Sequence, residues 1–190
     1  MKTDQRLFRI AGWTAVIAAV ITFFTIITFA IGISVGWERV GQANDIAAAL
    51  MALLHLPILL AVDKSVRPPS RVQLVIGLLA ALVVAVVQIL FVAGVVEFAF
   101  TTVPAALGSG ILALIYMAYN WQARQAQALP NGLTLVGLIA NAGGALASFA
   151  SLLRPDHPLV WVGGTLYLLN VVWLFWLGRL WLSGKGSMAA

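Results

Sequence analysis

Long uncharged runs dominate this sequence and constrain its fold more than any other feature. Between Arg9 and Glu38 lie 28 residues without a charge, and 25 more lie between Arg71 and Glu97. A helix needs about 20 mostly apolar residues to cross roughly 30 Å of hydrocarbon, so each run is long enough to span a bilayer. Only 9% of the 190 residues are charged and 62% are hydrophobic. The sequence therefore predicts an integral membrane protein and excludes the soluble, disordered and coiled-coil classes.

Charged and turn-forming segments divide the chain into six predicted spans. Helices are favoured over a β-barrel because the runs are long and lack the alternating pattern of barrel strands. The loops between the runs leave no room for a soluble domain, so residues 1–190 are expected to form one domain. The predicted fold is an all-α bundle of six transmembrane helices, near residues 9–36, 44–62, 71–100, 104–123, 131–153 and 158–182.

Local sequence marks the breaks between these spans. The polar segment 37–42 ends the first span, and Ser70 followed by Gln73 fits a capping box at the start of the third. Residues 101–104 form the shortest break, with Pro104 expected in the first turn of the fourth span. Each predicted helix thus has a chemical reason to start or stop.

The basic residues predict the orientation of the bundle. With the N-terminus in the cytoplasm, nine of the 11 Lys and Arg residues lie inside, a strong positive-inside bias over short loops. We therefore expect a multi-pass protein of a prokaryotic cytoplasmic (inner) membrane with both termini cytoplasmic. The net charge of +5 is then explained by basic residues that set the membrane orientation and contact lipid headgroups. No nucleic-acid partner is expected. The inner residues are Lys2, Arg6, Arg9, Lys64, Arg67, Arg71, Arg124, Arg179 and Lys185; Arg39 and Arg154 lie outside.

A few polar residues fall deep inside the predicted spans. At about 1.5 Å of rise per residue, His55, Asn141 and Asn170 lie near the midplane, and Gln88 lies somewhat nearer the outer side. Unpaired polar groups at such depth cost several kcal/mol, so these side chains should face the bundle interior. One interpretation is a shared ligand-binding site, with backbone carbonyls freed beside Pro57. The other is a set of interhelical hydrogen bonds without a ligand.

Glu97 is the only acidic residue well inside an apolar stretch. Its distance from Arg71 places it near the outer boundary of the membrane. It is expected either to form an interfacial salt bridge with Arg39 or Arg154, or to gate the outer mouth of a proton or cation path. The fifth span carries Gly137, Asn141, Gly144 and Ser148 at helical spacing, which predicts close helix packing and the most buried helix. The alternative for this stripe is a ligand channel along it.

Several kinds of chemistry lack the residues they need. The chain has no Cys, and its three Lys residues lie outside the spans, so no thiolate site and no retinal-type Schiff base can form. No metal site and no cofactor are expected, because His55 and His157 lie at different depths and no phosphate-binding loop is present.

One enzymatic function is suggested by Ser109 on the fourth span and His157 before the sixth. Their order resembles intramembrane rhomboid proteases, which implies a serine nucleophile at Ser109 paired with a histidine. Two departures are visible: Leu107 stands where that family has a glycine, and His157 lies between prolines in a loop.

A second resemblance is broader. The opening Arg9-Ile10-Ala11-Gly12, the six short-looped spans and the Asn- and Gly-containing fifth helix are similar to bacterial multi-spanning membrane proteins of unknown function. It assigns no site residue. The function we expect is non-enzymatic: a transporter or membrane-embedded binding protein for a small or lipid-like ligand. The alternatives are an accessory or scaffold subunit of a membrane complex, as a homo-oligomer or with other membrane subunits, and, third, an intramembrane serine hydrolase.

Overall fold

The protein is built from seven α-helices in this computed structural model, which describes residues 2–36, 40–66, 69–154 and 156–184. No strand occurs within these ranges. Six segments are long and apolar enough to cross a membrane, with the last two helices forming one of them, so the predicted all-α bundle of six spans is confirmed. The helices are α1 (Lys2–Val35), α2 (Gly41–Ser65), α3 (Arg71–Val92), α4 (Phe98–Gln125), α5 (Asn131–Leu153), α6 (Pro158–Tyr167) and α7 (Leu169–Leu182).

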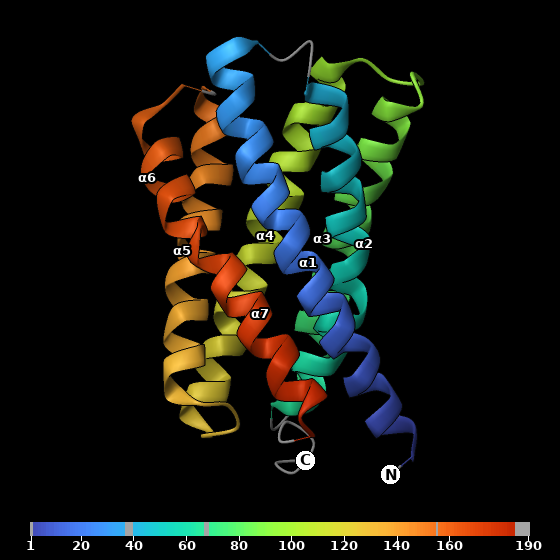
Figure 1. Cartoon of the computed structure of the whole chain (residues 1–190), viewed down its shortest axis with the longest axis vertical. Helices are drawn as coiled ribbons and strands as arrows, with labels where there is room; N and C mark the ends of the chain where they lie inside the picture. Colours follow the sequence, from blue (N-terminus) through green and yellow to red (C-terminus); the bar gives the residue numbers. More distant parts are fainter. Residues whose placement is uncertain (1, 37–39, 67–68, 155, 185–190) are drawn as a thin grey trace.

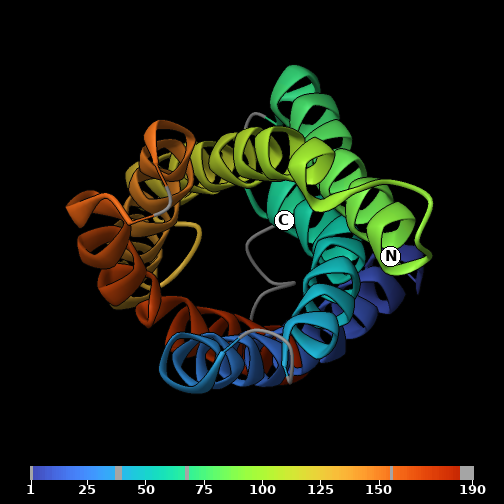
Figure 2. The same cartoon turned by 90° about the horizontal axis from the view of Figure 1, so that it is seen from above.

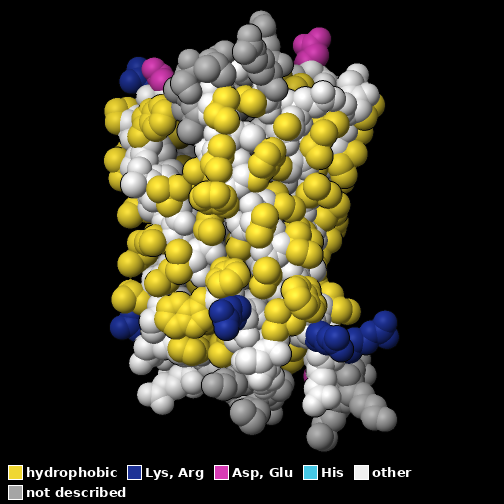
Figure 3. Space-filling view, viewed as in Figure 1, with side chains coloured by type: hydrophobic (Ala, Val, Ile, Leu, Met, Phe, Trp, Pro, Cys, Tyr) yellow, Lys and Arg dark blue, Asp and Glu magenta, His cyan; other side chains and the backbone are white. Residues whose placement is uncertain are grey.

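The helices stand side by side in a ring (Figures 1 and 2). Each packs against the next in chain order, and α7 closes the ring by packing against α1. We call the end at which α1 begins and α7 ends the proximal end, and the opposite end the distal end (Figure 1). On the face shown in Figure 3, hydrophobic side chains cover the middle, most Lys and Arg side chains lie toward the proximal end, and acidic side chains lie at the distal end.

The boundary between the third and fourth spans differs from the prediction. Helix α3 ends at Val92 and α4 begins at Phe98, so the break lies at 93–97 and not at 101–104. Gly94 makes this turn with a φ of +71°, a conformation that glycine adopts without steric cost. Pro104 therefore falls inside α4 and not in its first turn. A proline near a helix start removes only one backbone hydrogen bond, which this helix tolerates.

Other boundaries were predicted more closely. Ser70 caps α3, its Oγ accepting from the Gln73 amide at 3.3 Å, which confirms half of the expected capping box. The Gln73 side chain instead accepts from Gln122 Nε2 of α4 at 3.0 Å. The start of α1 is an exception, because this helix begins at Lys2 and not near the predicted residue 9. Positions 37–39 of the first predicted break lie outside the described residues.

The last span is bent between α6 and α7. At Leu168 the chain tightens into two short-range bonds, Leu168 N to Thr165 O and Val171 N to Leu168 O, both 3.3 Å. A stretch of 3₁₀-type bonds inside a helix often marks a hinge. The bend directs α6 along α5 and α7 along α1. The last span therefore packs against α5 through α6 and against α1 through α7.

Packing is densest in the proximal half of the bundle. Gly12 and Gly178 let α1 and α7 approach so closely that a Cβ on Gly178 would lie 2.7 Å from the Gly12 carbonyl oxygen. The main hydrophobic core comes from the proximal parts of the helices, with Phe8, Tyr119, Leu133, Leu177 and Trp181 all buried. These side chains therefore fill the interior of the proximal half as a solid plug.

Candidate functional site

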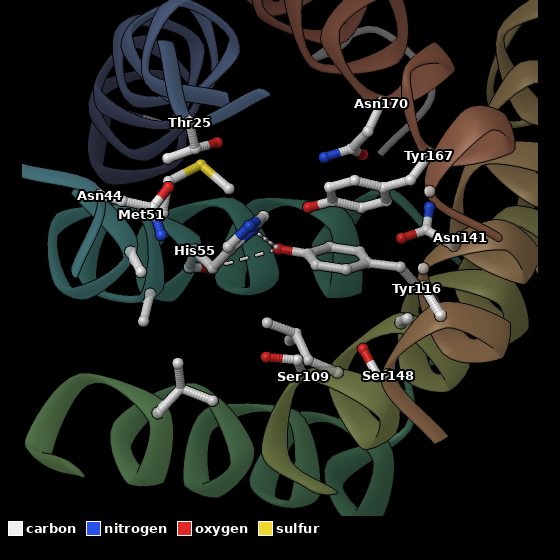
Figure 4. A pocket seen from close by; sticks show the side chains of 18 residues that line it. Thr25, Asn44, Met51, His55, Ser109, Tyr116, Asn141, Ser148, Tyr167 and Asn170 are labelled. Atoms are coloured by element: carbon white, nitrogen blue, oxygen red, sulfur yellow. Dashed lines mark hydrogen bonds between the residues drawn. The ribbon is translucent and has the colours of Figure 1, made fainter. Parts of the chain in front are cut away.

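A cavity of about 280 Å³ lies inside the ring, in its distal half, and every helix contributes to its wall. No Lys, Arg, Asp or Glu stands in this wall as far as the chain is described. The apolar part includes Met51, Val84, Leu112 and several small residues. The polar part consists of Thr25 of α1, Asn44 and His55 of α2, Ser109 and Tyr116 of α4, Asn141 and Ser148 of α5, Tyr167 of α6 and Asn170 of α7 (Figure 4).

His55 and Tyr116 form the floor of the cavity. The imidazole of His55 is 5% exposed, and its Nδ1 lies 2.8 Å from the Tyr116 hydroxyl (Figure 4). The Tyr116 ring meets the Trp173 ring edge-on, with centroids 5.1 Å apart. This arrangement fixes the histidine ring and gives the cavity an aromatic base.

Hydrogen bonds below this floor join α4 to α7. Trp173 Nε1 donates to Asn120 Oδ1 at 3.1 Å, and Asn120 Nδ2 donates to the Tyr116 carbonyl at 2.8 Å. The glycine at position 137 makes room for this pair, because a Cβ there would overlap both Asn120 and Trp173. The floor is thus held by polar contacts as well as by packing.

The two mid-membrane asparagines differ in how their amides are used. Asn141 Nδ2 donates to the Gly137 carbonyl one turn back, at 2.8 Å. Asn170 is 1% exposed and lies beside Tyr167 (Figure 4), while its Oδ1 has no hydrogen-bond partner among the described residues. A buried acceptor left unpaired costs about 1–3 kcal/mol, so Asn170 is a site that a donor group would stabilise.

The structure brings together three of the five predicted ligand-binding residues. His55, Asn141 and Asn170 all stand in the wall of the cavity. Gln88 is half-buried on α3, outside this wall, and its Oε1 is buried without a partner in the described part of the chain. Glu97 is exposed at the start of α4, also away from the cavity.

Glu97 was misplaced because the break before α4 was misplaced. It is the residue that precedes α4 and not part of a long third span. Of its two expected partners, Arg154 instead has its Nε 3.3 Å from Asp156, and Arg39 lies outside the described residues.

Sequence reasoning missed two tyrosines that dominate the wall. Tyr116 and Tyr167 both present their hydroxyls to the cavity (Figure 4). Tyrosine in membrane proteins prefers the interfaces, so a tyrosine well inside a span is a signal that could have found Tyr116. Thr25, Asn44 and Ser148 carried no comparable signal.

The pair expected for a serine hydrolase is not assembled. Ser109 stands in the cavity wall, whereas His157 caps α6, its Nδ1 accepting from the Leu159 amide at 3.2 Å. His55 is in the wall but is bonded to Tyr116. Among the hydrogen bonds of the described residues, none joins Ser109 to a histidine, and the same residues contain no cluster of three metal-ligating side chains.

The small residues of α5 pack within the chain. Gly143 and Gly163 bring α5 and α6 into backbone contact, and Gly144 lies under the Tyr167 ring. Of the six spans, α5 has the largest buried share, which confirms the predicted packing. The stripe therefore shapes one side of the cavity wall.

A comparison with protein-family models, curated proteins and solved structures found no match to this chain.

Proposed function

We propose that this protein binds a small uncharged ligand inside the membrane, as a binding protein or transporter. The observation that carries this proposal is the convergence of nine uncharged polar side chains, from six helices, on one cavity. Side chains that served only to join helices would be paired across a filled core. Here they border open space, and Asn170 keeps an acceptor without a partner in the described chain.

The wall favours a neutral ligand over an ion. A charged group would leave water for a site without a counter-charge, at a cost of several kcal/mol. The hydroxyls and amides can both donate and accept hydrogen bonds, while Met51 and the tyrosine rings supply apolar surface. These features fit a molecule that carries a hydroxyl, carbonyl or amide group.

The concentration of basic residues toward the proximal end supports an inner-membrane orientation with that end in the cytoplasm. The cavity would then lie in the outer half of the membrane. The scaffold alternative gains no support from the small residues of α5, because Gly137, Gly143 and Gly144 are occupied by contacts within the chain.

Thermal unfolding with a matched panel of compounds tests this proposal. Purified protein is screened against uncharged alcohols, ketones and amides, and against carboxylates and amines of the same carbon skeletons. A ligand at 100 times its Kd adds about 2.7 kcal/mol of stability, a shift that is easily measured. We expect stabilisation by uncharged members only, lost in Asn170→Leu.

Gln88→Leu is the matched control, because it removes a half-buried amide outside the cavity, whose Oε1 has no partner among the described residues. It should leave the stabilisation unchanged. Equal stabilisation of the Asn170→Leu variant, or stabilisation by the charged compounds, would show that the cavity is not the binding site.

A further inference from the structure

We propose that the ligand of this cavity is an uncharged amphiphile that enters sideways from the bilayer, through an opening between α1 and α6 at Gly164. This inference rests on the proposed function, since it presumes that the cavity binds a ligand. It adds the route of entry and the class of molecule.

Gly164 marks the opening. It lines the cavity and is itself exposed, and from this combination we place the mouth of the cavity at this residue. A Cβ added to Gly164 would meet no atom within 4 Å in the described structure. The neighbouring Gly163 is the opposite case, because a Cβ there would lie 2.5 Å from Ala147 N and 2.6 Å from Gly143 O. The side of α6 that carries Gly163 therefore packs against α5, while the side that carries Gly164 borders free space.

The arrangement of the helices explains why the gap is there. Helix α1 packs against α2 and α7, and α6 packs against α5. The bend at Leu168 separates α6 from the line of α7, so α1 and α7 close the ring proximally (Figures 1 and 2). In the described residues, α1 and α6 make no contact comparable with these, which leaves the distal part of the ring without a closing pair.

The opening faces hydrocarbon. One turn before Gly164 on α6, Trp161 is 50% exposed, and Leu168, at the bend just after α6, is 45% exposed. Exposed apolar side chains of this size are typical of a lipid-facing surface in a membrane bundle. A molecule at Gly164 thus comes from the bilayer.

Polar groups lie directly inside the opening. Tyr167 and Asn170 follow Gly164 by one and two turns, and both line the cavity (Figure 4). A hydroxyl or amide head entering here could donate to Asn170 Oδ1, which lacks a partner within the described chain. Since none of the described wall residues is Lys or Arg, a phosphate head finds no cation among them to neutralise it. The geometry therefore selects an apolar tail, left among the lipids, and an uncharged head.

The absence of cysteine allows a clean test by single-cysteine labelling. Ser148 lines the cavity from α5, and the exchange of an oxygen for a sulfur in Ser148→Cys changes the cavity volume little. The variant is reconstituted into phosphatidylcholine vesicles and treated with two thiol reagents: lipid-soluble, uncharged benzyl methanethiosulfonate, and water-confined, charged 2-sulfonatoethyl methanethiosulfonate. We expect the uncharged reagent to react at least tenfold faster.

The opening itself is tested by adding a second substitution to Ser148→Cys. Gly164→Trp fills free space and should slow the uncharged reagent at least tenfold, whereas Gly164→Ala should not. Val162→Trp is the matched control, because Val162 is 51% exposed on α6 but does not line the cavity. Thermal unfolding checks that each variant is folded, and Gly164→Leu replaces Gly164→Trp if the larger side chain prevents folding.

Two results would overturn the inference, and they are distinguishable. If the charged reagent reacts as fast and Gly164→Trp changes nothing, the cavity opens to water: the lateral route is wrong and the binding site remains. If neither reagent modifies Ser148→Cys, while both modify the exposed control Asp156→Cys, the cavity is closed. The proposed function then fails together with the route.

Discussion

His55 and Tyr116 join two helices that are not neighbours in the ring: α2 and α4 are separated by α3, yet His55 Nδ1 lies 2.8 Å from the Tyr116 hydroxyl. Other packing in the ring runs mainly between adjacent helices. This contact acts as a brace across the interior, and it sets the depth at which the cavity ends.

Removing the Tyr116 hydroxyl should weaken the bundle measurably. Tyr116→Phe leaves a buried imidazole nitrogen without its partner, and we expect a loss of about 0.5–2 kcal/mol in unfolding free energy. Unfolding in mixed detergent micelles measures the loss. In a double-mutant cycle with His55→Leu, the two single losses should not add, because both remove the same contact. Full additivity would show that the brace contributes nothing.

Two adjacent glycines should respond in opposite ways to the same change. Gly163→Ala forces α6 away from α5, because the new methyl group would overlap the backbone at Ala147 and Gly143, and should cost about 1–3 kcal/mol. Gly164→Ala meets free space and gains helix propensity, so it should be neutral or stabilising by up to about 1 kcal/mol. Thermal unfolding of both variants gives the comparison. Equal losses would contradict the close α5–α6 contact.

Asp63 should be needed as a hydrogen-bond acceptor. Its Oδ1 accepts from the Tyr119 hydroxyl at 2.9 Å and from the Ser70 amide at 3.2 Å, which ties the turn before α3 to α4. Asp63→Ala leaves both donors unpaired and should lower stability by about 1–3 kcal/mol. Asp63→Asn keeps an acceptor oxygen and should lose less. If Asp63→Asn is as damaging as Asp63→Ala, the charge and not the hydrogen bonding stabilises this turn.

Single cysteines also test the proposed orientation. Asp156 lies in the turn between α5 and α6 at the distal end, and Ser183 follows α7 at the proximal end; both are exposed. A membrane-impermeant maleimide applied to intact cells should label Asp156→Cys and should label Ser183→Cys only after the membrane is permeabilised. The reverse pattern would place the basic end outside and contradict the positive-inside assignment.

The sequence predicted the bundle well because the signals for spans are long and redundant. Six apolar runs between charges identified all six spans, and Ser70 identified the start of α3. The break at 93–97 was missed because it contains no polar residue except Glu97 at its end and depends on the backbone conformation of Gly94. The bend at Leu168 has no proline or glycine at the bend itself, so its cause is tertiary: α6 follows α5 while α7 follows α1.

The site was predicted in part for a related reason. Depth could be counted along each span, which is why His55, Asn141 and Asn170 were identified. Which way a side chain faces depends on how the helices are rotated, and depth alone cannot distinguish Gln88, which points elsewhere, from Asn141. Thr25 and Ser148 reach the wall only because the ring holds their helices apart around a space.

The solid plug in the proximal half makes the cavity a dead end. A molecule that enters at Gly164 has no continuous way across, so in this conformation it can leave only by the route it took. Passage to the other side would require the packed core of the proximal half, where Gly12 and Gly178 bring α1 and α7 together, to rearrange. Under the proposed function, that rearrangement is what distinguishes a transporter from a binding protein.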